Sequence, residues 1–206
     1  MGQGNPMRLG LDFDNTLVSY DRLFHRIALE RDWIPASCEA RKVAVRDLLR
    51  SAGREEDWTR LQGEVYGPRI MEAEAHEGML RALGTLHERG VPMVIVSHKT
   101  RTPYRGDAVD LHAAARRWLE RHGFHDPARF GWPADRVFLE LSQEAKIARI
   151  VDQGCTHYVD DLPEILEQLP DSIVKILFSP DDATAGRPGW QVMHRWHELP
   201  VLLQPS

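Results

Sequence analysis

Cysteine is scarce in this sequence of 206 residues. The two cysteines, Cys38 and Cys155, lie far apart and form no CxxC pair. They cannot build the disulfide framework of a small secreted domain, and their spacing argues against a structural zinc site. The ten histidines are scattered along the chain rather than clustered. We therefore expect no metal site built from cysteine or histidine.

Long apolar runs are also missing, and none approaches the length that spans a membrane. The first residues, MGQGNPM, lack the basic and apolar regions of a signal peptide. Pro6 stands where a myristoylation signal requires Ser or Thr. The sequence thus predicts a cytoplasmic protein with no membrane partner.

Basic residues are not in excess. The chain has 26 Lys and Arg against 31 Asp and Glu, a net charge of −5. Such a balance argues against a nucleic-acid polymer as partner, because those surfaces are normally basic. It is compatible with a small phosphorylated substrate held by a few local cations. A Walker A loop is absent, and the glycines of Gly2-x-Gly4 do not follow a strand, so a dinucleotide fingerprint is absent too.

What the chain does contain is an alternation of short apolar runs and helical segments. Strands that alternate with helices of this length favour a parallel α/β sheet, whose covered strands are apolar on both faces. The expected strands are 8–13, 92–97, 136–139, 156–160 and 173–178, and the expected helices are about 107–122, 141–153 and 161–169. A turn-rich loop after Phe178 is expected to precede a last short strand or helix at 190–199.

The region from about Val18 to Ala75 breaks this alternation. It has no convincing strand, and apolar residues recur at helical spacing, as at Leu23, Phe24 and Ile27. Ser37 is a candidate helix N-cap within it. We expect a core domain of residues 1–17 and 76–206, with 18–75 forming a small helical insertion after the first strand.

The stretch DFDNT places two acids, Asp12 and Asp14, at the end of the first expected strand. A carboxylate there is costly unless a charged group meets it. A calcium loop is excluded, because the positions that need Gly and Glu hold Leu17 and Leu23. A solvated strand end and a phosphoryl-transfer site remain.

Three further features follow in the chain. Ser97 ends the run VPMVIVS, Lys146 lies in a helical segment, and Asp160 and Asp161 end the run HYVDD. Each feature alone has an ordinary explanation; the acidic pair, for example, could cap a helix starting near residue 162. In this order, with DFDNT first, the set resembles the haloacid dehalogenase (HAD) superfamily of hydrolases over about residues 7 to 178. The resemblance implies a Rossmann-like, doubly wound parallel sheet, and it makes the insertion 18–75 a small helical cap.

The resemblance also implies catalytic roles. Asp12 would be the nucleophile that forms an aspartyl phosphate, and Asp14 the general acid and base. Ser97 would bind the phosphoryl oxygens, and Lys146 would supply a fixed cation. Each of these assignments rests on the matching motif position.

Metal and substrate ligands follow from the same comparison of motifs. Oxygen-only ligands indicate Mg²⁺. Its expected ligands are Asp12, the backbone carbonyl of Asp14, Asp161 directly and Asp160 through water. The expected substrate-binding residues are Thr16, which would also orient its own loop through a backbone hydrogen bond, Ser97, His98 and Lys99.

The function expected from these features is a Mg²⁺-dependent phosphatase for a small phosphorylated metabolite. By the same resemblance, Asp14 favours a phosphate ester or anhydride as substrate, because dehalogenases and phosphonatases of the superfamily lack an acid there. A phosphotransferase or phosphomutase, or a catalytically silent phospho-ligand-binding protein, remains an alternative. A receiver domain is disfavoured, since its phosphorylated Asp follows the acidic pair in the chain.

Two sets of residues stay open between binding and structural roles. Arg101, Tyr104 and Arg105 could contact a second anionic group of the substrate or form a solvated loop. Four residues of the expected cap could determine specificity or serve as cap core or surface. These are Tyr20, Arg22, His25 and Trp33.

Overall fold

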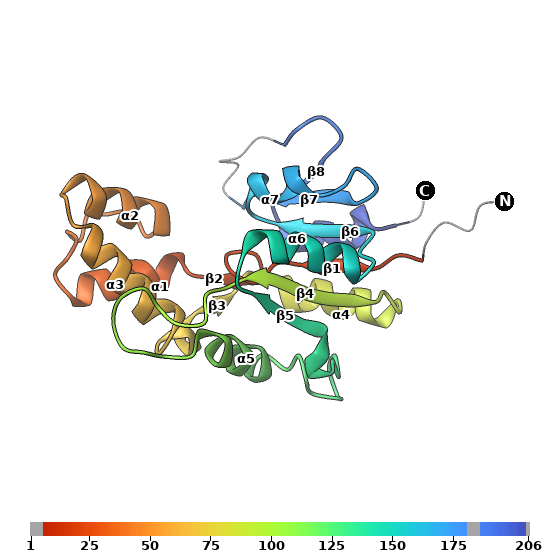
Figure 1. The fold of residues 1–206 in the computed structure, drawn as a ribbon, viewed down its shortest axis with the longest axis horizontal. Helices are drawn as coiled ribbons and strands as arrows, with labels where there is room; N and C mark the ends of the chain where they lie inside the picture. The colour runs from red at the N-terminus through yellow and green to blue at the C-terminus, as the bar shows by residue number, and fades with distance from the viewer. Residues whose placement is uncertain (1–5, 181–185, 205–206) are drawn as a thin grey trace. The chain divides into compact units, whose positions relative to one another are not determined.

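A computed structural model describes residues 6–180 and 186–204 of the chain (Figure 1). The chain divides into two compact units. The first consists of Met1–Leu17, Ala75–His98 and His125–Ser206, and the second of Val18–Glu74 and Lys99–Phe124.

The first unit is built on one six-stranded sheet with the order β5–β4–β1–β6–β7–β8 (Figure 1). Every neighbouring pair in it is parallel. The strands are β1 (Leu9–Leu11), β4 (Met93–His98), β5 (Val137–Glu140), β6 (His157–Asp160), β7 (Val174–Phe178) and β8 (Gln191–Met193). The parallel sheet of an α/β protein, expected from the sequence, is confirmed.

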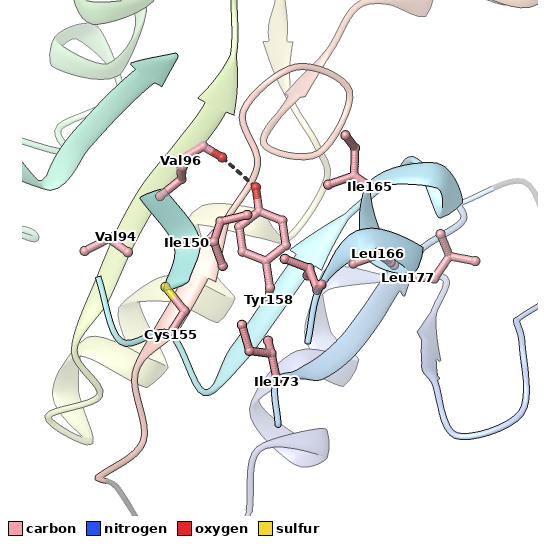
Figure 2. Packing of buried hydrophobic residues seen from close by; sticks show 10 residues of the cluster. Val94, Val96, Ile150, Cys155, Tyr158, Ile165, Leu166, Ile173 and Leu177 are labelled. Carbon is pink, nitrogen blue, oxygen red and sulfur yellow. Dashed lines mark hydrogen bonds between the residues drawn. The ribbon is translucent and has the colours of Figure 1, made fainter. Parts of the chain in front are cut away.

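Helices complete this unit because each parallel connection needs a crossover. They are α4 (Met79–Glu88), α6 (Gln143–Asp152), α7 (Pro163–Gln168) and α8 (Leu199–Leu202), with 3-10 turns η2 (Ala134–Arg136) and η3 (Trp196–Glu198). Side chains from α6 and α7 meet those of β4, β6 and β7 in a buried apolar cluster around Tyr158 (Figure 2). The Tyr158 hydroxyl donates to the Val96 carbonyl at 2.5 Å, which satisfies its polar atom inside this core.

Most expected elements of this unit are present with shifted ends, and α4 is an additional helix. The sequence predicted no helix between residues 76 and 91, because Gly84 and Thr85 weaken the helical signal there. A helix is nonetheless needed, since β1 and β4 are parallel neighbours. The buried side chains of Met79, Leu83 and Leu86 form its apolar stripe.

The second unit is helical. It contains α1 (Asp21–Glu30), α2 (Lys42–Ser51), α3 (Glu55–Tyr66), the turn η1 (Ile70–Glu72) and α5 (Leu111–Arg121). Phe24 stacks on Trp58 with ring centroids 5.0 Å apart, and Tyr66 meets Phe24 edge-on at 5.6 Å. Helix α5 belongs to this unit, where the buried Trp118 indole donates to the Ala73 carbonyl at 2.9 Å.

Two local expectations need correction. Ser37 does not cap a helix, because α2 begins at Lys42 and its N-cap position holds Arg41. No strand was expected in region 18–75, but the short strands β2 (Val18–Ser19) and β3 (Glu74–Ala75) lie at its two ends and form a two-stranded sheet. That 18–75 acts as a cap remains a proposal.

The C-terminal segment contains both element types that the sequence allowed, the strand β8 and the helical turns η3 and α8. Part of the expected loop before it, residues 181–185, lies outside the described residues. Among the residues that the structure describes, no helix combines the length and apolarity needed to cross a membrane.

Gly10 in β1 lies where a side chain would collide with the core. A Cβ atom there would lie 2.5 Å from Cδ2 of Tyr158 and 2.9 Å from Sγ of Cys155. Tyr158 is fully buried and held by its hydroxyl, so it cannot move aside. We expect Gly10→Ala to lower the free energy of unfolding by about 1–3 kcal/mol, as overpacking does.

The control for this prediction is Gly84→Ala in α4, where a Cβ would meet nothing within 4 Å. That substitution should leave stability unchanged or raise it by up to about 1 kcal/mol. Thermal melts of the two variants beside the wild type measure both effects. An unchanged melting temperature for Gly10→Ala would contradict the close approach of β1 and Tyr158.

Candidate active site

The strand register brings the predicted site residues together. Strand β1 lies between β4 and β6, and Leu11 is level with Ile95 on one side and Val159 on the other. The Asp12 amide continues the ladder by donating to the Val159 carbonyl at 2.9 Å. The strand order changes direction at β1, and ligand sites of open α/β sheets lie outside the strand ends at such a point.

The loop after β1 turns sharply because of local contacts. Phe13 is fully buried, and its carbonyl accepts from the Leu17 amide at 3.0 Å. Asn15 has φ 58°, a left-handed conformation that Asn tolerates better than most residues. The buried Thr16 hydroxyl donates to Asp161 Oδ1 at 3.3 Å, which ties the loop to the end of β6. We expected Thr16 to orient the loop by a backbone contact; the contact found is to a carboxylate of the site.

Asp12 is held by two donors on one oxygen. Ser97 Oγ donates to Asp12 Oδ1 at 2.8 Å, and Lys146 Nζ donates to the same atom at 2.6 Å. Among residues 6–180 and 186–204, no donor contacts the other oxygen, Oδ2. The carboxylate is therefore fixed in orientation and keeps one oxygen available for reaction.

Lys146 reaches the site because helix α6 is anchored at its start. The Ser142 side chain caps this helix by accepting from the Ala145 amide at 3.2 Å. Lys146 Nζ lies 2.6 Å from Asp12 Oδ1 and 2.6 Å from Asp160 Oδ2, and only 2% of the residue is exposed. Burial disfavours its charged form, but the two carboxylates outweigh burial and raise the pKa of Lys146.

Asp160 combines a structural and an electrostatic role. Its Oδ1 accepts from the Leu162 amide at 2.9 Å, next to Pro163 in the first turn of α7. Burial raises the pKa of Asp160 to about 7, with Lys146 lowering it and Asp12 raising it. One ammonium thus does not fully compensate the buried carboxylates.

Three carboxylates could hold a metal ion. Ligand oxygens of Asp12, Asp160 and Asp161 lie within 4.8 Å of one another. When all three are ionised, their negative charges exceed the single positive charge of Lys146 by two, which a divalent cation would offset. The oxygen donors are of the kind that Mg²⁺ prefers, so the residues present fit the expected metal.

Asp14 and His98 are two further residues that the sequence predicted for the site. Asp14 is half-buried in the same loop but is outside the three-carboxylate group. His98 is the last residue of β4 and is half-buried. The pKa of Glu144 is lowered mainly by hydrogen bonds from its own backbone and from Ser142, and to a smaller extent by the charge of His98. Roles in catalysis or binding for these residues remain predictions.

Lys99 belongs to the second unit and is buried. Its ammonium lies 4.9 Å above the centre of the Tyr66 ring, and its carbonyl contacts the His112 imidazole at 2.8 Å. A buried cation over an aromatic ring is a stable arrangement in its own right. Its contribution to substrate binding therefore remains a prediction.

The cluster after Lys99 has features of a solvated loop. Arg101 pairs with Asp110 at 2.9 Å, Arg105 pairs with Glu56 at 3.5 Å, and 83% of Tyr104 is exposed. Both arginines thus already have acidic partners.

The four open residues of region 18–75 also have structural roles. Tyr20 is buried against the Tyr66 ring, and Arg22 forms an exposed ion pair with Glu74. The His25 imidazole contacts the Cys38 carbonyl at 2.9 Å. Two arginine guanidinium groups lie over the Trp33 ring, those of Arg31 and Arg54.

Sequence reasoning missed Tyr158 as part of the site's support. Its ring lies 5.7 Å from Lys146 Nζ, and its hydroxyl bonds the Val96 carbonyl beside Ser97 (Figure 2). A tyrosine inside an apolar strand was a signal that could have found it, since its hydroxyl needs a buried partner.

Comparisons with known proteins show the fold. No protein-family model matches the sequence, and no curated protein matches it either. Solved structures match over nearly the whole chain at low identity, and the first of them are HAD-superfamily hydrolases. The chain therefore has the fold of the HAD-like hydrolases.

Three of these structures illustrate the range. The magnesium-bound HAD-type protein YfnB of Bacillus subtilis has a TM-score of 0.56 at 13% identity, covering 98% of this chain and 100% of the other. A predicted phosphoglycolate phosphatase from Haemophilus somnus has 0.55 at 14% identity, covering 98% and 100%. A dehalogenase has 0.56 at 14% identity, covering 98% and 99%. Likeness of fold alone does not choose between phosphatase and dehalogenase chemistry.

Proposed function

We propose that this protein is a Mg²⁺-dependent phosphatase that hydrolyses a small phosphorylated metabolite through an aspartyl phosphate on Asp12. The observation that carries the proposal is the buried Asp12 carboxylate, oriented through Oδ1 by Ser97 and Lys146 beside two further acids. The two donors fix the orientation of this carboxylate, which supports its assignment as the nucleophile.

In the proposed reaction, Asp12 Oδ2 attacks phosphorus and forms an acyl phosphate while the bond to the leaving alkoxide breaks. Asp14 gives its proton to that alkoxide. Water then attacks the acyl phosphate, Asp14 takes a proton from the water, and phosphate leaves as Asp12 is regenerated. Asp14 supports an ester as substrate, since an alkoxide leaving group needs a proton and a halide does not.

Lys146 keeps its proton throughout, as its raised pKa requires, and offsets the charge of the phosphorylated site. Ser97 lies at hydrogen-bonding distance from the attacking carboxylate, where its hydroxyl can turn toward a phosphoryl oxygen. A Mg²⁺ ion held by Asp12, Asp160 and Asp161 would neutralise charge on the phosphoryl oxygens.

The test is turnover of p-nitrophenyl phosphate and a panel of phosphorylated metabolites, with Mg²⁺ and with excess EDTA. We expect phosphate release that requires Mg²⁺, and no chloride release from chloroacetate. Addition of a sugar acceptor should leave the yield of free phosphate unchanged, since a phosphotransferase would divert the phosphoryl group to the sugar. Pure, folded protein that releases no phosphate from any ester with Mg²⁺ would refute the proposal.

A further inference from the structure

His76 contacts the DFDNT loop from a distant part of the sequence. Its Nε2 atom lies 2.9 Å from the Asn15 carbonyl oxygen, across 61 residues of chain. A carbonyl can only accept a hydrogen bond, so Nε2 carries a proton and donates it. The His76 amide donates in addition to the Leu17 carbonyl at 3.0 Å. His76 thus holds the loop at two carbonyls that follow Asp14.

The conformation of Asn15 makes the first of these contacts consequential. Asn15 lies between Asp14 and Thr16, and its φ of 58° is less favourable than a right-handed conformation, although Asn tolerates it better than most residues do. A donor on its carbonyl fixes the peptide plane between Asn15 and Thr16. The path of the backbone just after Asp14 is therefore set in part by His76.

The imidazole ring is itself held in place. It meets the Phe178 ring edge-on, with centroids 4.8 Å apart and planes at 88°, and Phe178 packs against Trp196. His76 and Phe178 also line a cavity of about 300 Å³, with His194 and Trp196 among the other lining residues. A slightly larger ring at position 76 has room there.

We propose that His76 is a positioning residue for Asp14, acting through its hydrogen bond to the Asn15 carbonyl. The proposal rests on the proposed function, in which Asp14 protonates the leaving group. Loss of the bond would leave the nucleophile Asp12 in place and misplace the acid. Misplacement of a catalytic group by about 1 Å can cost about 100-fold in rate.

The experiment compares His76→Phe with His76→Gln. Phenylalanine keeps a ring against Phe178 but has no donor, whereas glutamine carries an amide N–H at a similar reach. For His76→Phe we expect kcat to fall about 10- to 100-fold on an alkyl phosphate and less than about 3-fold on p-nitrophenyl phosphate, whose leaving group needs little protonation. KM should change little, and His76→Gln should restore most of the alkyl phosphate rate.

The control is His194→Phe, which changes another imidazole of the same cavity. The Nδ1 atom of this imidazole contacts the Ser179 carbonyl at 2.7 Å, and Ser179 is outside the DFDNT loop. Its ratio of alkyl to p-nitrophenyl rates should equal that of the wild type. Equal loss on both substrates by His76→Phe, or no loss on either, would overturn the positioning role.

A second measurement does not depend on turnover. Hydrogen exchange at the Leu17 amide, bonded to the Phe13 carbonyl, reports how firmly the loop is closed. It should speed up at least about 5-fold in His76→Phe and return toward the wild-type rate in His76→Gln. Unchanged exchange in His76→Phe would overturn the inference. If the wild-type protein hydrolysed no ester, the proposed function would be refuted. The exchange measurement would still decide separately whether His76 holds the loop.

Discussion

Asp12→Asn is expected to abolish turnover of every phosphate ester. An amide is too poor a nucleophile to form the acyl phosphate, and no other described carboxylate accepts from both Ser97 and Lys146. Asparagine is nearly isosteric, and its Oδ1 can still accept from both donors. The variant should therefore be folded, with a melting temperature close to that of the wild type, and inactive in a phosphate-release assay at saturating Mg²⁺.

Asp14→Asn is the matched control, because it changes the same functional group two residues away. It leaves the nucleophile and removes the proton donor, so its rate should fall by about 100- to 10,000-fold on alkyl phosphates and less on p-nitrophenyl phosphate. A beryllofluoride adduct trapped in the wild type should be bonded to Asp12. Substantial turnover by Asp12→Asn, or an adduct on another residue, would contradict the assignment.

Lys146→Met is expected to lower the free energy of unfolding more than any other substitution proposed for this protein. Methionine has a similar length, but the substitution removes the ammonium that lies 2.6 Å from both Asp12 and Asp160. Two buried carboxylates then lack their partner, and breaking a buried pair typically costs about 3–5 kcal/mol. In EDTA, the melting temperature should fall by well over about 5 °C.

This loss should depend on pH in a defined direction. Lys146 lowers the pKa of Asp160, which burial has raised to about 7, so the pKa rises further when the ammonium is removed. A folded-state pKa above the unfolded value means that the native state binds the extra proton, so stability falls as pH rises between the two values. Near pH 6 Asp160 is mostly protonated in both native proteins. Near pH 8.5 it is mostly ionised in the wild type, whereas in the variant it must stay protonated or ionise without the ammonium beside it. The deficit should be larger at pH 8.5.

Lys175→Met is the control for the lysine substitution. Lys175 is mostly buried on β7, but its partner Asp171 is fully exposed at the other end of a 3.5 Å ion pair. Its removal leaves no buried charge, so the loss should be small and nearly the same at both pH values. A deficit for Lys146→Met that is equal at pH 6 and 8.5 would contradict the role of Lys146 as the counter-charge of Asp160.

The sheet and the order of the site residues could be predicted because both depend on local patterns. Apolar runs such as PMVIVS indicate covered parallel strands, and polar residues at their ends must meet at one edge of the sheet. Asp12, Ser97 and Asp160 were placed in this way, and the hydrogen bonds now link the first two directly and Asp160 through Lys146.

Contacts across long stretches of chain could not be predicted. The bonds from Thr16 to Asp161 and from His76 to Asn15 depend on how the loops fold back, which no periodicity encodes. Helix α4 was missed because Gly84 weakens its signal, although tertiary packing of its apolar stripe compensates. The grouping of α5 with the helical unit depends on tertiary contacts such as Trp118 to Ala73.

The chain passes between its two units four times, after Leu17, Glu74, His98 and Phe124. The helical unit is therefore assembled from two separate stretches of sequence. Removing 18–74 alone would leave α5 without the Ala73 carbonyl that its buried indole requires, and without η1, against which it packs. Any attempt to express the sheet by itself must replace both stretches with short linkers, and swapping the helical unit with that of another protein must exchange both together.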